Sequence, residues 1–255
     1  MRYYFLASGS SGNATALVND ENEILLIDCG IAYSDIKNKL EEVGLSVENI
    51  KKVLITHMHI DHTKSLRAFE PCNVYLNVFY DMSDFNQFDY YQHLEVLGFE
   101  IYTVPLSHDD KGNTGFIITY KGEKMAYITD TGYVHENVQM LINNCDIYCI
   151  ESNHDPRLLM LTKRPMFLKQ RILSSNGHLC NQDCAYVLGN VIGPNTKEIV
   201  FLHRSQEANT EDMIIHTFMS TMSKMDVDVS GIKINIARQS EVVKCGTISS
   251  LCENR

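Results

Sequence analysis

Long apolar runs are missing from this sequence of 255 residues, in which no stretch approaches the 18 consecutive apolar residues that a membrane-spanning helix needs. The apolar run at the N-terminus is too short for a secretory signal, and we expect a cytoplasmic protein. Linkers rich in Pro, Gly or Ser, internal repeats and low-complexity tracts are missing as well. Because 44% of the residues are hydrophobic and 21% are charged, the composition excludes a disordered chain, and we expect a single domain spanning residues 1–255.

The eight cysteines include no pair with the C-x2-C spacing that is typical of structural zinc sites. Cys145 and Cys149, and likewise Cys180 and Cys184, have three residues between them. We therefore expect most of the cysteines to be reduced and buried as small hydrophobic side chains.

Positive charge is scarce, since the net charge is −10, and this on its own argues against a nucleic-acid-binding protein. One segment departs from this balance. Residues 156–182 contain no Asp or Glu and five basic residues, namely Arg157, Lys163, Arg164, Lys169 and Arg171. Such a segment is either a solvent-exposed helix or a local binding site for phosphate groups.

The hydrophobic pattern alternates short strands with helices. Strands are expected at residues 3–6, 14–18, 23–27, 52–56, 73–76, 100–104, 114–120, 124–129, 145–150 and 198–202. Helices are expected from a cap at Ser34 to Gly44, and at residues 62–69, 133–143, 181–190 and 209–223. Short paired strands followed by strand–helix units predict a layered α/β sandwich.

The strongest chemical signal is the segment Thr56-His57-Met58-His59-Ile60-Asp61-His62, which follows directly on the strand expected at residues 52–56. A loop that leaves a strand can turn its side chains in different directions. His57 and His59 can then bind one metal ion while Asp61 and His62 bind a second. Imidazole and carboxylate ligands suit Zn, Mn, Fe or Ni.

Four ligands cannot complete two metal sites, so this interpretation requires partners elsewhere in the chain. His108, Asp130 and His203 each follow a predicted hydrophobic strand. Because the carboxyl ends of strands in layered α/β folds meet at the edge where sites form, we expect these three residues to join the cluster.

With these seven residues, the chain resembles the metallo-β-lactamase superfamily of metal-dependent hydrolases over essentially its whole length. The resemblance implies an αββα sandwich with the metals at one edge of its two sheets. Further motifs are similar to the YycJ/WalJ-type branch, which lacks an inserted β-CASP domain and is associated with 5′-to-3′ exonuclease activity on DNA. These motifs are Gly9-Ser10-Ser11-Gly12-Asn13, Leu25-Leu26-Ile27-Asp28-Cys29-Gly30, Thr129-Asp130-Thr131-Gly132, Glu151-Ser152-Asn153-His154-Asp155, and Gly177-His178-Leu179 with Asn181.

The resemblance leads to an assignment of metal ligands and catalytic residues. We expect two divalent ions, Zn or Mn, that share a bridging water and clamp a phosphate. His57, His59 and His108 would bind the first ion, Asp61, His62 and His203 the second, and Asp130 would bridge them. Asp61 and Asp130 would act in catalysis, with Asp61 also holding the attacking hydroxide. Asp28 would either orient a ligand by hydrogen bonding or simply close a turn before Gly30.

A second group of residues is expected to bind substrate. His154, which we also expect to act in catalysis, and His178 flank the basic segment and could hold a phosphate or protonate the leaving oxygen together with Arg164. For His178 the alternative is a structural role beside a helix capped by Asn181. Ser11 and Asn13 belong to a Gly-rich loop that could grip a terminal phosphate or be a tight turn.

Three positions depart from the branch that the chain resembles. Cys180 stands where a Ser is usual, Arg204 replaces a Leu, and Ala208 replaces an Asn. Arg204 is expected at the substrate cleft, where it could contact substrate or fill the cleft.

These expectations lead to one main function and two alternatives. The main function is a dinuclear phosphodiesterase, a 5′-to-3′ DNA exonuclease whose partner is a nucleic acid with a phosphate-bearing end. One alternative is a thioester or lactone hydrolase of small molecules, and the other is a non-catalytic metal-binding member of the fold.

Overall fold

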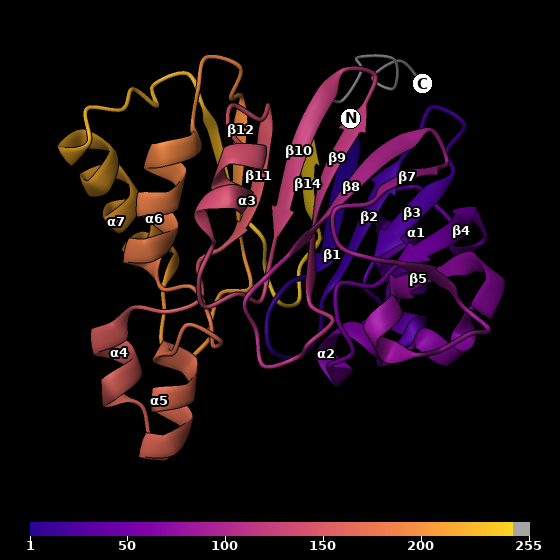
Figure 1. The fold of residues 1–255 in the computed structure, drawn as a ribbon, viewed down its shortest axis with the longest axis horizontal. Coiled ribbons are helices and arrows are strands. Elements are labelled where there is room, and N and C mark those ends of the chain that lie inside the picture. Colours follow the sequence, from indigo (N-terminus) through magenta and orange to yellow (C-terminus); the bar gives the residue numbers. More distant parts are fainter. Residues whose placement is uncertain (247–255) are drawn as a thin grey trace.

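The computed structural model describes residues 1–246 of the chain. Two seven-stranded sheets pack face to face, and helices cover the outer face of each (Figure 1). The αββα sandwich expected from the sequence is therefore confirmed, whereas a single domain over residues 1–255 stays a prediction.

The first sheet has the strand order β14-β1-β2-β3-β4-β5-β6. Its strands are β1 (Arg2–Ala7), β2 (Ala14–Val18), β3 (Ile24–Ile27), β4 (Ile50–Leu54), β5 (Val74–Asn77), β6 (Asn86–Phe88) and β14 (Val243–Gly246). The strands from β3 to β6 run parallel to one another, so their carboxyl ends meet at one edge.

The second sheet has the order β13-β12-β11-β10-β9-β8-β7. Its strands are β7 (His93–Val96), β8 (Phe99–Pro105), β9 (Thr114–Tyr120), β10 (Glu123–Ile128), β11 (Ile147–Glu151), β12 (Glu198–Leu202) and β13 (Lys233–Ile236). β10 to β13 are parallel, and β8 runs in the same direction because β9 is antiparallel to both β8 and β10.

Strand alternation builds the core on both faces of the sheets. In β10, Met125 and Tyr127 face the layer between the sheets, while Ala126 and Ile128 face the helices. Both sets are buried, because successive side chains of a strand point to opposite faces and each face here is covered.

Seven α-helices and four short 3-10 turns complete the described residues. The helices are α1 (Tyr33–Glu42), α2 (Ile60–Thr63), α3 (Glu136–Leu141), α4 (Pro156–Leu161), α5 (Met166–Leu173), α6 (Asn181–Val191) and α7 (Glu211–Lys224). The 3-10 turns are Val47–Asn49, Leu66–Ala68, Pro71–Asn73 and Val78–Tyr80. Helix α1 packs on the first sheet, and α3, α6 and α7 pack on the second (Figure 1). Within this part of the chain, none of the helices combines the length and the apolar character that crossing a membrane would demand.

Several boundaries differ from those expected. Ser34 lies inside α1, whose N-cap is Ala32, and the Sγ of Cys180 rather than Asn181 caps α6. The helix expected at residues 62–69 is reduced to α2 and one 3-10 turn, because the loop must turn its ligands toward the sheet edge. Strands β6, β7, β13 and β14 were not anticipated, and the solvent-exposed helix that was one alternative for residues 156–182 forms as two helices, α4 and α5. Seven cysteines are free thiols, with Cys72 exposed and the others buried, and Cys252 lies outside the described residues.

Candidate metal centre

The backbone turns sharply where three of the strands end. Asp28 follows β3, Asp130 lies two residues beyond β10 and His203 follows β12, and their φ angles are 60°, 51° and 51°. Side chains other than Gly rarely adopt this left-handed conformation, which costs about 1–3 kcal/mol per residue and is concentrated at functional sites. The conformation turns all three side chains into the space between the sheet edges.

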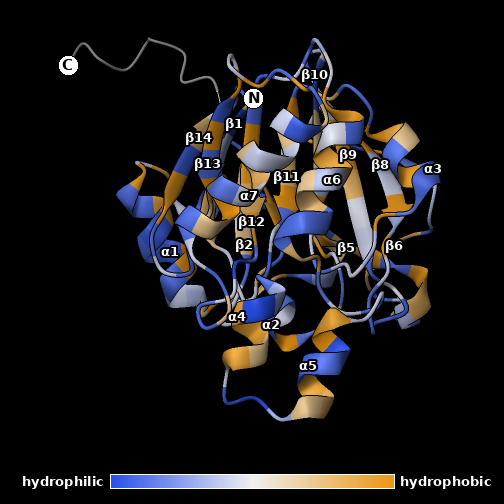
Figure 2. Ribbon diagram, turned by 90° about the vertical axis from the view of Figure 1, so that its left-hand side faces the viewer, coloured by the Kyte–Doolittle hydropathy of each residue, from blue (hydrophilic) through white to orange (hydrophobic). Residues whose placement is uncertain are grey.

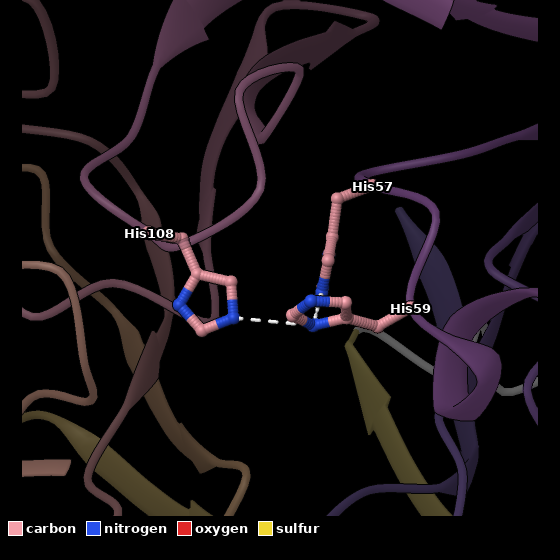
Figure 3. Close-up of side chains that lie close together, drawn as sticks. All are labelled: His57, His59 and His108. Carbon is pink, nitrogen blue, oxygen red and sulfur yellow. Dashed lines mark hydrogen bonds between the residues drawn. The ribbon is translucent and has the colours of Figure 1, made fainter. Parts of the chain in front are cut away.

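Three histidines form one group of potential metal ligands. The Nε2 of His57 lies 3.0 Å from the Nδ1 of His59, which lies 3.3 Å from the Nε2 of His108 (Figure 3). The Nδ1 of His108 lies 3.0 Å from the Gly177 carbonyl oxygen to which it donates, and this bond turns Nε2 toward the other two rings. The structure thus assembles the first predicted ligand set from two distant segments.

A second group contains Asp61, His62, Asp130 and His203. The Nε2 of His62 lies 3.2 Å from Asp130 Oδ2 and 3.8 Å from Asp61 Oδ2. The Nε2 of His203 lies 3.5 Å from Asp130 Oδ1 and 3.8 Å from the same Asp61 oxygen. Asp130 also groups with His57, so it lies between the two ligand sets, and its bridging role stays a prediction.

Asp28 holds the loop that carries the ligands. Its buried carboxylate accepts the backbone N–H of Thr56 at 2.9 Å, and its Oδ2 lies 2.7 Å from the Nδ1 of His62. This hydrogen bond leaves the Nε2 of His62 to face the cluster, which matches the orienting role predicted for Asp28. Gly30 allows the loop to approach, since a Cβ there would lie 1.6 Å from the carbonyl oxygen of Asp61.

Glu151 is a site residue that sequence reasoning missed. It ends β11, is fully buried, and places its Oε1 3.0 Å from His203 Nδ1 and 2.7 Å from His178 Nδ1. Its Oε2 accepts the backbone N–H groups of Thr131 and Leu179. The signal was its position, because Glu151 ends a hydrophobic strand at the same edge as the predicted ligands.

The electrostatics of the cluster favour positive charge. Burial lowers the pKa of His62, but the carboxylates of Asp28 and Asp130 outweigh burial and raise this pKa to about 10. Burial raises the pKa of Glu151, but His178 and the hydrogen bonds from His178 and His203 outweigh it and lower this pKa to about 2. The carboxylates at the centre are therefore held as anions, which a dication would neutralise.

These residues fit a divalent metal. The Nε2 of His203 is buried and has no hydrogen-bond partner, although it faces two carboxylates. His62, His108 and His203 each use Nδ1 for an outer hydrogen bond and turn Nε2 toward the cluster, which is the usual arrangement of metal-bound imidazoles. Nitrogen and carboxylate donors without thiolate suit Zn, Mn or Fe.

The predicted substrate residues divide into two sets. His178 and Arg164 line a small cavity of about 120 Å³ that also reaches His108, and Ser10 and Arg171 complete its polar wall. The sequence predicted a substrate-binding role for Ser11, but it is the neighbouring Ser10 that lines this cavity, and Ser11 does not.

The remaining predicted residues lie elsewhere. Asn13 is buried beneath the ligand loop, where its Nδ2 lies 3.0 Å from His62 Nε2 and 3.3 Å from the Asp61 carbonyl oxygen. Arg204 directs Nη1 to the Asn209 carbonyl at 3.4 Å and does not line the cavity. It therefore does not fill the space beside the ligands.

His154 is buried outside the ligand clusters. It is 1% exposed, its Nδ1 lies 3.3 Å from Asn153 Oδ1, and its Nε2 has no hydrogen-bond partner. Burial lowers its pKa to about 4, so it is a poor proton donor near neutral pH. Its catalytic and substrate-binding roles stay predictions, and the geometry favours His178 for both.

Comparisons with known proteins agree with this geometry. A family model described as the beta-lactamase superfamily domain matches residues 24–203, a range that contains every ligand named above. The chain belongs to the metallo-β-lactamase superfamily. It is 30% identical to the exodeoxyribonuclease WalJ of Streptococcus pneumoniae over 246 residues, which cover 89% of this chain and 90% of WalJ. It is 29% identical to the exodeoxyribonuclease YycJ of Bacillus anthracis over 232 residues, covering 84% of this chain and 86% of YycJ.

A solved structure supports the fold of this superfamily member. The metallo-β-lactamase-fold protein YhfI of Bacillus subtilis superposes with a TM-score of 0.70 at 16% identity, covering 96% of this chain and all of YhfI. Together with the relatives, the fold places the protein among the hydrolases of the superfamily, as the sequence predicted.

Proposed function

We propose that the protein is a 5′-to-3′ exodeoxyribonuclease that uses two divalent ions, Zn or Mn. The observation that carries this proposal is the polar cavity beside the ligands, where Arg164 and Arg171 stand next to His108 and His178. Guanidinium groups bind phosphate oxygens through paired hydrogen bonds, so this wall suits a phosphodiester or a terminal phosphate. The relatives are named exodeoxyribonucleases, which supports a DNA substrate. The 5′-to-3′ direction is what the resemblance to the YycJ/WalJ-type branch implies.

The residues divide the reaction between them. His57, His59 and His108 would hold one ion, Asp61, His62 and His203 the other, with Asp130 between them. Bound dications would activate water and withdraw charge from the phosphate. Arg164 and Arg171 bind and orient the phosphate.

His178 supplies the proton that the leaving oxygen requires. Its Nδ1 is held at 2.7 Å by the buried Glu151, so Nε2 carries the exchangeable proton toward the cavity. The carboxylate fixes the orientation of the ring.

The proposed activity is tested with 5′-phosphorylated duplex and single-stranded DNA of defined length, incubated with protein loaded with Mn or Zn. We expect metal-dependent shortening from the 5′ end and a loss on the order of 10³-fold in Asp61→Ala, because several kcal/mol of charge stabilisation are removed. Asp228→Ala, an exposed position, is the control. Absence of cleavage by protein that carries two ions would overturn the nuclease proposal and direct the search to smaller phosphodiesters.

The basic segment provides a second prediction. Lys163→Ala/Arg164→Ala should raise the KM for DNA roughly tenfold. The slope of the logarithm of the DNA-binding constant against the logarithm of the salt concentration should become shallower by about 2, because two phosphate contacts are lost. Metal content should not change. Glu207→Gln should lower the KM for DNA, because the Glu207 Oε2 accepts a hydrogen bond from Arg164 Nε at 2.9 Å and the substitution removes this competing negative charge.

Lys37→Ala/Lys224→Ala is the control for this prediction, because it removes the same charge from α1 and α7. An unaltered KM in the Lys163/Arg164 variant, or an equal rise in the control, would show that the segment does not contact the substrate.

A further inference from the structure

An exposed apolar surface covers the α4–α5 hairpin, defined here as residues 156–173. Leu161 is 81% exposed, Phe167 is 73% exposed and Met166 is 54% exposed, and Met160 and Leu173 are exposed beside them. The hairpin projects beyond the edge of the sheets where α2 carries its ligands (Figure 1), and hydrophobic residues colour both helices in Figure 2. Apolar side chains gathered in this way on a projecting element are typical of a contact surface.

The hairpin is built to be rigid. Lys169 is only 7% exposed and donates its ammonium hydrogens to the carbonyl oxygens of Met160 and Thr162, both at 2.7 Å. Beneath the hairpin, Leu159 and Ile172 pack on Ala208 in a small core of their own. The methyl group of Ala208 extends this apolar packing.

The cap of α4 adds to this rigidity. The Oδ1 of Asp155 accepts the backbone N–H groups of Arg157 and Leu158 at 2.8 and 3.0 Å. The exposed side chains are therefore held on a rigid support. This support consists of the capped first turn of α4, the hydrogen bonds that tie α5 to α4, and the packed base of the hairpin.

The base of the hairpin reaches the metal centre. Leu168 and Ile172 of α5 line the cavity that also contains His108 and His178. Since a helix with its side chains is about 10–12 Å across, the outward face of α5 lies within one helix diameter of that cavity. A DNA end held at the cavity would therefore lie within about one helix diameter of this face.

The charges around the apolar surface of the α4–α5 hairpin indicate what binds there. Arg157 and Lys163 are exposed around the apolar residues, Arg171 is exposed and paired with the Asp109 carboxylate, and residues 156–182 contain no acidic side chain. A second copy of the hairpin would bring the same cations against these and be repelled. A duplex end fits, because it presents a flat apolar base pair between two anionic strands.

We propose that the α4–α5 hairpin is a wedge that stacks Phe167 and Leu161 on the terminal base pair of duplex DNA and opens it. This inference rests on the proposed function and adds to it the step by which a duplex end becomes a single strand at the metal centre. Apolar side chains that are inserted beside base steps unstack them, and cations on either side hold the separated phosphates.

The test compares Phe167→Ala and Leu161→Ala/Phe167→Ala with the unmodified protein on three 5′-phosphorylated DNAs. These are a blunt duplex, the same strand alone, and a duplex whose last four pairs are mismatched. We expect the ratio of the rates on blunt duplex and single strand to fall about tenfold or more in the double variant. The mismatched end should restore most of that loss, because no pairs remain to be opened. Met140→Ala, at an apolar position of α3 that is 72% exposed, should leave the ratio unchanged.

Two results would overturn the wedge. The first is an equal loss on all three DNAs, or no loss at all, which would deny any role in opening the end. The second is a concentration-dependent dimer that the double variant abolishes, which would assign the surface to a second copy.

A binding measurement separates failure of the wedge from failure of the proposed function. Asp61→Ala protein is mixed with a duplex that carries 2-aminopurine at its terminal pair, whose fluorescence rises on unstacking. A rise that Leu161→Ala/Phe167→Ala removes supports the wedge even if the unmodified protein cuts no DNA. No rise overturns the wedge, whatever the cleavage assay shows.

Discussion

Asp130→Asn is expected to lower hydrolysis on the order of 10³-fold and to reduce the bound metal to less than two ions per chain. The carboxylate lies 3.2 Å from His62 Nε2 and 3.5 Å from His203 Nε2, and it stands between both ligand sets. Replacing it with a neutral amide removes several kcal/mol of attraction for the dications. Asparagine is chosen because Asn, like Asp, tolerates the left-handed backbone that this position requires.

Metal analysis and steady-state rates on the same preparation measure this effect. Asp226→Asn is a matched control, since exposed Asp226 has a φ of 56° and lies after α7, away from the ligands. It should keep both the metal and the activity. Full metal content with full activity in Asp130→Asn would show that this carboxylate does not bridge the two sites.

Glu151→Gln is expected to lower kcat by roughly 10- to 100-fold with a smaller change in KM. Its carboxylate fixes the rings of His178 and His203, and loss of such outer partners of metal ligands typically costs this much in affinity or activity. Glutamine keeps an acceptor for the N–H groups of Thr131 and Leu179, so the fold should persist.

Glu198→Gln provides the control for Glu151. Glu198 is another buried glutamate in the same sheet, but it begins β12 at the opposite edge, where its Oε2 accepts from the Tyr3 hydroxyl. A merely structural effect would lower activity equally in both variants and change KM and kcat together. A loss confined to kcat in Glu151→Gln would establish a positioning role.

The sequence was most informative about functional residues that lie close together in the chain or directly after a strand. The segment from His57 to His62 follows a buried strand, and three further ligand candidates follow β8, β10 and β12, which run in the same direction so that their carboxyl ends share an edge. Short paired strands followed by strand–helix units predicted a layered α/β sandwich, and the resemblance to the superfamily implied the αββα order of its layers. The ligand spacings and the strand pattern are local features, so they can be recognised in the sequence.

The sequence was less informative where the partners are far apart. Glu151 contacts His178 and His203 across 27 and 52 residues, and no local pattern distinguishes it from any buried strand end. The sequence favoured His154 over His178 as a catalytic residue, yet His154 is buried outside the cluster and His178 lines the cavity. The sequence predicted a surface cation at Lys169, whereas the structure shows that its side chain ties α5 to α4.

The sequence by itself determined the layered α/β class and the candidate metal ligands, because these depend on residue type, strand periodicity and spacing, and its motifs carried the resemblance to the superfamily. Only the tertiary structure decided which histidine faces the cavity, that Asp28 and Glu151 orient the rings, and that an apolar hairpin stands beside the site. These properties arise when side chains from distant segments compete for the same buried space and the same hydrogen bonds. That competition is settled by packing at the edge of the two sheets and not by any one segment.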